Sequence, residues 1–264
     1  MKRELFPTGK KRKEDVAQKM KEAGYFTGSE LGKEFMNTRY GWLDSPLDNP
    51  ESSLTDKPLY ETFKSLLPPG EKSLRNYIES TLEDKRGDAV GIEFGGIGVK
   101  AFSQFSQGFF RQSIGVTLAD HRESNDPDTT TQSETHKIIE GNFFDRETYQ
   151  TLNKILEGGR ASLILERIGG GVDFVPQEPY LAAHTLQQWY ELLDEGGLML
   201  IEIPRKLNVL MPWWYEEVKK HKDTIDFDIA TAGSVFRLRK LTNAPETLPL
   251  IKPELMRKIL RRYK

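Results

Sequence analysis

The sequence contains no cysteine. This absence excludes disulfides, thiolate zinc sites, iron–sulfur clusters and any cysteine nucleophile. Radical chemistry at a cluster and cysteine-dependent attack on a pyrimidine ring are therefore excluded too. Histidine is also scarce, with four residues, and no group of His, Asp and Glu has the spacing of a metal site. We expect a protein that holds no metal.

Long apolar runs are missing as well. No stretch approaches the ~20 apolar residues that a membrane-spanning helix needs. The first thirteen residues have the charge of a signal peptide but lack the apolar segment that must follow it. We therefore expect a cytoplasmic protein without a membrane partner. Neither a Gly-x-Ser-x-Gly nor a Gly-Lys-Ser/Thr motif is present.

The net charge of −2 is unevenly distributed. Residues 1–13 and residues 252–264 each carry six Lys or Arg against one Glu, which leaves a charge of −12 on residues 14–251. Basic ends of this kind can contact nucleic acid or other polyanions. The alternative is that both ends are solvated tails, which charged ends usually are.

The middle of the chain alternates short apolar runs with helix-like segments, the clearest of which are residues 100–110 and 179–193. This pattern predicts an α/β fold with a doubly wound, mostly parallel sheet covered on both faces. Two further runs, residues 224–229 and 234–241, flank Ala232-Gly233 and predict a closing antiparallel hairpin. Seven strands are expected, of which the first five are residues 89–94, 113–118, 137–140, 161–165 and 198–203.

Three parts are expected along the chain. Residues 1–85 begin with a short amphipathic helix at 13–23 and then mix aromatic residues with Pro and Gly, which indicates an ordered helical and irregular cap, such as a substrate-recognition extension. Residues 86–241 form the α/β core, and residues 242–264 form a basic tail.

The most informative stretch follows the first apolar run. Glu93 closes this run, and Gly95, Gly96 and Gly98 come directly after it, before a helix-like segment. Glycines here let the backbone approach a ligand closely, and free N–H groups at a helix start favour an electron-rich group. A carboxylate ahead of the glycines suits a cationic ligand or a hydrogen-bond donor, whereas a phosphate-binding loop has no use for one.

Ligands of doubly wound sheets bind outside the carboxyl ends of the strands. The sequence resembles the class I S-adenosylmethionine-dependent methyltransferases there, through the acid and glycines after the first strand and through Gly196-Gly197 before the fifth. The resemblance covers residues 86–241. It implies a cofactor site for S-adenosyl-L-methionine built from Glu93, Phe94, Gly95, Gly96, Gly98, Thr117, Asp120, Asn142 and Phe143.

The resemblance also assigns roles within that site. Glu93 would act near the amino end of the methionine part, and Phe143 could cover the adenine face. Thr117 stands where the family has its ribose-binding acid, and Asp120 is the nearest acid. Asn142 replaces the acid that meets the adenine amine, and its carbonyl can still accept from that amine. The alternatives are a helix-start partner for Glu93, a loop carboxylate for Asp120 and core packing for Phe143.

Catalytic candidates follow the fourth strand. Glu166 and Arg167 form an ionisable pair at the end of an apolar run, where a base or a substrate clamp would lie. His184 follows on the next helix. The alternatives are a surface ion pair and a solvated histidine. The Asn/Asp-Pro-Pro-Tyr/Phe signature of amino-methyltransferases is absent after this strand, and the methyl acceptor, a small molecule, a nucleic acid or a protein, stays open.

Two other functions compete with a methyltransferase. Gly96-x-Gly98-x-x-Ala101 matches the looser dinucleotide fingerprint, and Asp120 follows about twenty residues later, as in NAD-dependent oxidoreductases. Glu93 ahead of the glycines and the lack of a Tyr-x-x-x-Lys dyad directly after the fourth strand argue against that function. A non-catalytic binding or scaffold protein that keeps the fold is the third hypothesis, because Thr117 and Asn142 stand where the family has acids.

Overall fold

The structure is a computed structural model. It describes residues 43–45, 47–48, 59–117, 134–141, 145–166, 179–202, 211–230 and 235–248. For residues 179–183 and 211–213 it describes the backbone alone. The expected helix at 13–23 and the basic end at 252–264 lie outside these ranges, as do residues 1–13.

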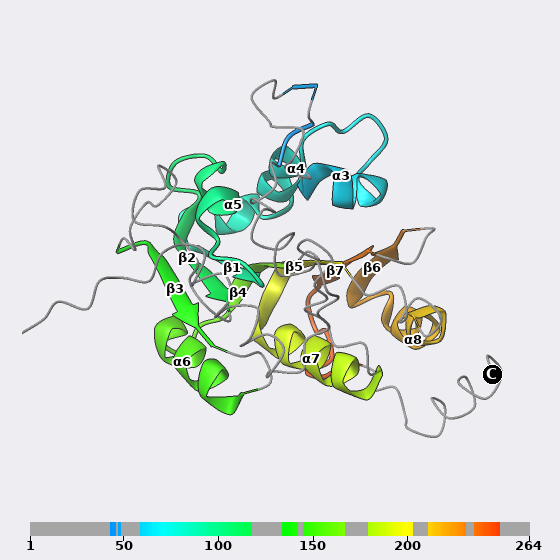
Figure 1. Ribbon diagram of the computed structural model, residues 1–264. Helices are drawn as coiled ribbons and strands as arrows, with labels where there is room; N and C mark the ends of the chain where they lie inside the picture. The colour runs from blue at the N-terminus through cyan, green and yellow to red at the C-terminus, as the bar shows by residue number, and fades with distance from the viewer. Residues whose placement is uncertain are drawn as a thin grey trace, which may run out of the picture.

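A seven-stranded sheet forms the centre of the molecule (Figure 1). Its order is β3-β2-β1-β4-β5-β7-β6; the first five strands of this order are parallel, and β7 pairs antiparallel with both β5 and β6. The predicted doubly wound sheet with a closing antiparallel hairpin is therefore confirmed. The strands are β1 (Ala89–Phe94), β2 (Phe110–Thr117), β3 (His136–Glu140), β4 (Ala161–Glu166), β5 (Leu193–Glu202), β6 (Ile225–Ile229) and β7 (Val235–Lys240).

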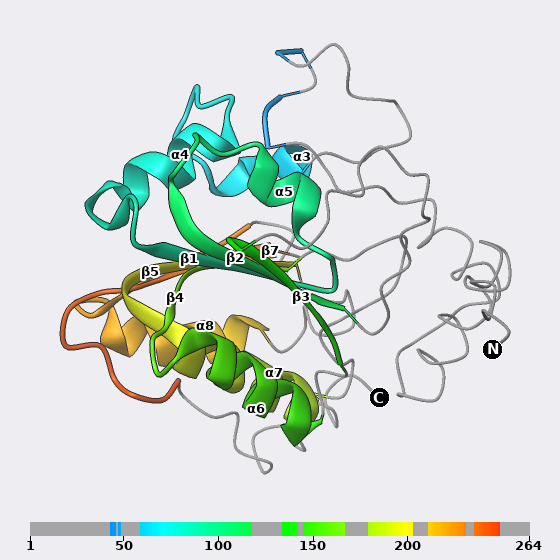
Figure 2. The ribbon, with the colours of Figure 1, turned by 90° about the vertical axis from the view of Figure 1, so that its left-hand side faces the viewer.

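Helices cover both faces of this sheet, as Figure 2 shows with the sheet seen edge-on. One face carries α3 (Leu59–Phe63), α4 (Leu74–Thr81) and α5 (Val99–Ser103), and the other carries α6 (Arg146–Leu156), α7 (Pro179–Leu192) and α8 (Met211–Val218). Short 3₁₀ turns follow three of these helices, η1 (Lys64–Leu66), η2 (Glu83–Lys85) and η4 (Lys219–His221).

Each face has its own hydrophobic core. Strand residues alternate between the two, so that Ile92 and Phe94 pack toward α6 and α7, whereas Leu163 and Leu165 pack toward α3, α4 and α5. Residues from 59 to 82, expected to belong to the cap, supply a large part of the second core through Leu59, Phe63, Leu66, Leu74, Ile78 and Leu82. A substrate-recognition role for residues 1–85 stays a prediction.

Three elements differ by more than one residue from the sequence expectation. The helix expected at 100–110 ends at Ser103, and the chain then turns, with Gly108 at a left-handed φ of 72°, into β2, which begins at Phe110 instead of residue 113. The fifth strand begins at Leu193, before Gly196-Gly197. Its register against β4 shifts between Ala161 and Leu163, so the two glycines lie in a bulge within β5.

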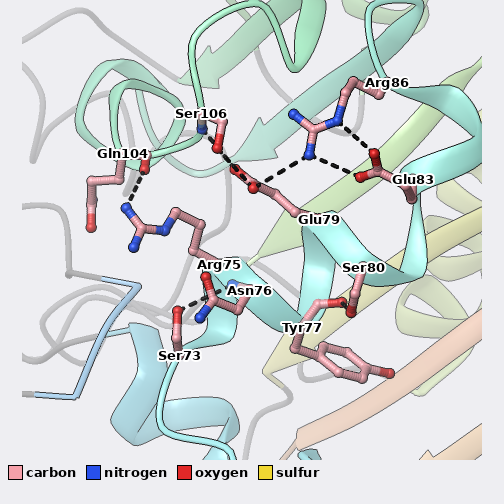
Figure 3. Close-up of polar contacts among 10 residues, drawn as sticks. All are labelled: Ser73, Arg75, Asn76, Tyr77, Glu79, Ser80, Glu83, Arg86, Gln104 and Ser106. Carbon is pink, nitrogen blue, oxygen red and sulfur yellow. Dashed lines mark hydrogen bonds and ion pairs between the residues drawn. The ribbon is translucent and has the colours of Figure 1, made fainter.

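A polar network holds α4 to the loop that follows α5 (Figure 3). Glu79 accepts hydrogen bonds from the N–H of Ser106 at 2.7 Å and from its hydroxyl at 2.9 Å, and it lies 3.7 Å from Arg86. Arg75 donates to the carbonyl of Gln104 at 3.2 Å. The side chain of Glu79 is 13% exposed, whereas that of Glu83, which also pairs with Arg86, is 60% exposed.

Replacement of Glu79 by Ala tests this network. We expect the free energy of unfolding to fall by about 1–3 kcal/mol, because the N–H of Ser106 loses a charged acceptor. Chemical denaturation monitored by circular dichroism measures the change. Glu83→Ala is the matched control and should leave stability unchanged, because solvent screens its exposed ion pair. Equal losses in the two variants would contradict this assignment.

The burial of Tyr190 is expected to make the protein less stable at alkaline pH. Its side chain is buried, its hydroxyl donates to the carbonyl of Pro245 at 2.7 Å, and burial raises the pKa of Tyr190 from 10.0 to about 12. Between pH 10 and 12 the unfolded chain loses the Tyr190 hydroxyl proton before the folded chain does. The contribution of Tyr190 to the free energy of unfolding is therefore complete below pH 10 and falls by up to about 1.4 kcal/mol per pH unit above it.

Stability measured from pH 9 to pH 12 in the wild type and in Tyr190→Phe checks this sign. The variant should show a shallower decline. Burial also raises the pKa of Tyr149, which acts in the same direction in both proteins. Burial lowers the pKa of Lys240, which stacks on the Tyr190 ring, and this shift makes stability rise with pH up to 10.5. Identical slopes in the two proteins would contradict a role for Tyr190.

Candidate functional site

The strand order reverses between β1 and β4, because the chain builds β2 and β3 on one side of β1 and then returns to place β4 on the other. Doubly wound sheets bind ligands at this point, outside the carboxyl ends of the strands. The glycine turn, defined here as residues 95–98, lies at this place, directly after β1. The predicted cofactor residues of β1 and of the turn are therefore adjacent to the switch point.

Two glycines of the turn adopt left-handed conformations. Gly95 has a φ of 85° and Gly98 a φ of 73°, a region that residues with a Cβ enter at a cost. The N–H of Gly95 donates to the carbonyl of Val116 at 2.9 Å, which fixes the start of the turn on β2. Gly98 is the N-terminal cap residue of α5.

Glu93 supports the turn from β1. Its side chain is 8% exposed, and its Oε2 accepts a hydrogen bond from the N–H of Gly98 at 2.7 Å. Gly98 has no side chain with which to cap α5, and the carboxylate of Glu93 instead satisfies the N–H of Gly98 itself, one of the backbone donors that a helix start leaves without a partner in the helix. Glu93 therefore has the helix-start role that was considered as its alternative. The same bond holds its carboxylate beside the glycine turn.

Gly115 of β2 allows the turn to fold over the sheet. It pairs in register with Glu93, and a Cβ added to it would overlap the backbone of Ile97. Any larger residue at this position would displace the glycine turn. The sequence alone assigned no role to Gly115. Its role depends on the contact between β2 and the turn, which the sequence does not show.

His136 is a second residue that sequence reasoning missed. Its Nε2 lies 2.8 Å from the carbonyl oxygen of Ile97, and its Nδ1 lies 2.7 Å from the Oγ of Ser113. A carbonyl oxygen only accepts, so Nε2 carries the proton, and in the neutral ring Nδ1 accepts from the Ser113 hydroxyl. His136 thereby ties the glycine turn to β2 and β3.

The ends of β2 and β3 are only partly described. Thr117 is the last residue of β2, is buried, and accepts a hydrogen bond at its carbonyl from the N–H of Gly141 at 2.8 Å. A Cβ on Gly141 would overlap the side chain of Thr148, so this position also requires glycine. The predicted cofactor residues Asp120, Asn142 and Phe143 lie outside the described residues.

Glu166, one of the catalytic candidates, lies on the opposite face of the sheet from Glu93. Glu166 is 0% exposed at the end of β4, and its Oε2 accepts from the N–H of Glu202 at 3.2 Å. Glu166 pairs with Phe94, so its side chain lies on the α7 face of the sheet, whereas Glu93 lies on the α5 face. Two carboxylates therefore flank the switch point from opposite faces.

The other two catalytic candidates are His184 and Arg167. His184 lies on α7 with an exposed side chain, while Leu186, Trp189 and Tyr190 of the same helix are buried. Arg167 lies outside the described residues. Among the residues that the structure describes, no three His, Asp or Glu side chains form a group that could hold a metal ion, and no helix could cross a membrane.

No family model and no curated protein matches the sequence. Comparison with solved structures finds the methyltransferase MycE of the mycinamycin biosynthetic pathway, solved with Mg and SAH, at 14% identity over 69% of this chain and 51% of that chain, with a TM-score of 0.41. An rRNA methylase from Streptococcus thermophilus gives 10% identity over 66% of this chain and all of the other, with a TM-score of 0.42.

The N-methyltransferase NodS from Bradyrhizobium japonicum gives 9% identity over 63% of this chain and 94% of that chain, with a TM-score of 0.37. This chain spans about half the length of the MycE structures it matches. Likeness at such identities concerns the fold alone. The observed sheet agrees with the mostly parallel sheet and closing antiparallel hairpin expected from the sequence, and no specific subfamily is indicated.

Proposed function

We propose that this chain is an S-adenosylmethionine-dependent methyltransferase whose cofactor lies against the glycine turn, beside Glu93. One observation carries the proposal: the turn lies at the strand-order switch point, and Gly115 leaves room for it to fold over β2. Three of the four residues of the turn have no side chain, so no side chain of these three glycines would stand between its backbone and a ligand.

The residues present fit this cofactor. The carboxylate of Glu93 suits the cationic amino group of the methionine part, since it is buried and lies next to the turn. We assign the ribose to the end of β2, with Thr117 and Asp120, and the adenine to the end of β3, with Asn142 and Phe143. When bound, S-adenosylmethionine supplies a sulfonium methyl group for in-line displacement.

The protein's part in the reaction is mainly to hold its reactants in line. Orientation of this kind supplies much of the rate in a displacement that needs no covalent enzyme intermediate. Glu166, Arg167 and His184 are the candidates for orienting the acceptor or receiving its proton. Glu166 suits this role because it is buried at the end of β4, next to the switch point. The methyl acceptor is a small molecule or a nucleic acid.

The topology favours this function over a dinucleotide-dependent oxidoreductase. Dinucleotide-binding sheets have the parallel order 3-2-1-4-5-6, whereas here an antiparallel β7 lies between β5 and β6. Ala101 is fully buried, as the fingerprint's last position requires, but close packing of α5 on the sheet explains that burial equally well.

Calorimetric titration separates the candidate functions. We expect S-adenosylhomocysteine to bind the purified chain with a micromolar Kd and NAD to show no binding in the same buffer. Binding of NAD without S-adenosylhomocysteine would overturn the proposal in favour of an oxidoreductase. Binding of neither compound would also overturn it, and would favour a non-catalytic protein that keeps the fold for its surfaces.

A further inference from the structure

A pocket of about 390 Å³ lies between α5 and the first residues of β2 and β3. The rings of Phe102, Phe105 and Phe110 form its apolar part. Its polar part includes the side chains of Ser113 and His136. The volume lies within the range of small-molecule sites in proteins, which is roughly 300–1,000 Å³.

This pocket lies away from the proposed ribose and adenine positions. Ser113 and His136 are paired at the start of β3, whereas Thr117 and Glu140 are paired at the carboxyl ends of the same two strands. Four residues of extended chain separate these pairs, which corresponds to about 13 Å. A molecule in the pocket would therefore lie beside the opposite end of β2 and β3 from the proposed ribose and adenine positions.

The pocket is held in shape by residues around it. Ser106 lines the pocket and donates two hydrogen bonds to Glu79 of α4 (Figure 3). Arg75, also of α4, donates to the carbonyl of Gln104, two residues before Ser106. On the other side, His136 is fixed by Ser113 and by the carbonyl of Ile97. A pocket with fixed sides binds without first having to order them.

The chemistry of the lining indicates the kind of ligand. The described residues that line the pocket include no Asp, Glu, Lys or Arg, so none of these side chains offers a formal charge to pair with an ion. The hydroxyls of Ser103 and Ser106 already donate, to the carbonyl of Lys100 and to Glu79, and their oxygens keep lone pairs that can accept. Flat rings pack well against the three phenylalanines.

The pocket also contacts the support of the glycine turn. His136 lines it and donates from Nε2 to Ile97, the third residue of the turn. Val99 and Phe102 line it from α5, the helix that begins directly after Gly98. A ligand that shifts His136 or α5 would therefore act on the turn, and by thermodynamic linkage a ligand at the turn would act on the pocket equally.

We propose that this pocket binds a small uncharged aromatic molecule that carries a hydroxyl or amino donor, and that its occupancy changes the affinity of the glycine turn for its own ligand. The binding half stands on the pocket alone. The coupling half rests on the proposed function, because it needs a ligand at the turn.

Binding is tested with two fluorescent probes that share one ring system, 2-naphthylmethanol and 2-naphthoate. We expect the neutral alcohol to bind the full chain at least tenfold more tightly than the anion, because the carboxylate would be desolvated without a partner. Equal affinity for the two probes, or no saturable binding of the alcohol, would overturn the proposal.

Two matched variants locate the binding. Ser103 and Ser80 are both exposed serines whose hydroxyls donate to the carbonyl three residues earlier, but only Ser103 lines the pocket. Ser103→Trp should weaken binding of the alcohol at least tenfold, and Ser80→Trp should change it less than twofold. Gln107→Trp, at another exposed residue of the lining, repeats the test if the first variant unfolds. Undiminished binding in both pocket variants would contradict this location.

Coupling is measured by titrating S-adenosylhomocysteine with and without saturating 2-naphthylmethanol. We expect its Kd to change at least threefold in the wild type and to stay constant in Ser103→Trp. An unchanged Kd in the wild type would overturn the coupling and leave the pocket intact. If S-adenosylhomocysteine does not bind at all, the proposed function and the coupling fail together, and the naphthyl titrations still decide whether the pocket is a site.

Discussion

Gly115→Ala is expected to abolish micromolar binding of S-adenosylhomocysteine. The added Cβ would overlap backbone atoms of Ile97, and a backbone segment cannot rotate away as a flexible side chain can. The glycine turn must therefore move off β2, which should weaken binding more than tenfold. We also expect a loss of about 1–3 kcal/mol in the free energy of unfolding, as for other overpacked cores. Calorimetry and chemical denaturation measure the two effects.

Gly91→Ala is the matched control for this variant. Gly91 lies on β1, on the same face of the sheet as Gly115, and its Cβ would overlap the ring of Phe102 instead of a backbone. It should lose a similar amount of stability and keep its affinity for S-adenosylhomocysteine within about threefold. If both variants lost affinity equally, the packing of α5 would be responsible, and Gly115 would have no special relation to the turn.

Glu93→Gln should weaken binding of S-adenosylhomocysteine about tenfold while the protein stays nearly as stable as the wild type. The amide oxygen of glutamine can still accept from the N–H of Gly98, so the turn keeps its support. What the variant lacks is the negative charge that we assign to the amino group of the ligand. A charge-assisted hydrogen bond is roughly twice as strong as a neutral one, which accounts for the expected loss.

Glu93→Ala distinguishes the two roles of this carboxylate. It removes the acceptor of the Gly98 N–H as well as the charge, so the free energy of unfolding should fall by about 1–3 kcal/mol in addition to the loss of binding. Wild-type affinity in Glu93→Gln together with reduced stability in Glu93→Ala would show a purely structural role. Cofactor recognition by Glu93 would then be wrong.

The sheet was largely predictable from the sequence, because its strands are short apolar runs of nearly the observed lengths. The run at 89–94 matches β1 at both ends, and the hairpin around Ala232-Gly233 corresponds to β6 and β7. Buried parallel strands read as continuous apolar segments, which makes them visible without knowledge of their partners. The start of β5 was less visible, since the bulge at Gly196-Gly197 separates Leu193 from the apolar run that begins at Leu198.

The support of the turn was not predictable in the same way. His136 contacts Ile97 and Ser113 only because β3 pairs with β2 in one particular register, and a single sequence does not specify that register. The requirement for glycine at 115 likewise depends on where the turn folds back. The proximity of Glu93 to the turn was visible in the sequence, because the carboxylate and the glycines are neighbours in the chain.

A crystal structure of the protein grown with S-adenosylhomocysteine tests the central claim most directly. We predict that the ligand lies against the backbone of residues 95–98, with its amino group within hydrogen-bond distance of the Glu93 carboxylate and its adenine toward the end of β3. Electron density for the ligand at any other place on the molecule, or none at millimolar ligand, would contradict the assignment of this switch point as a cofactor site.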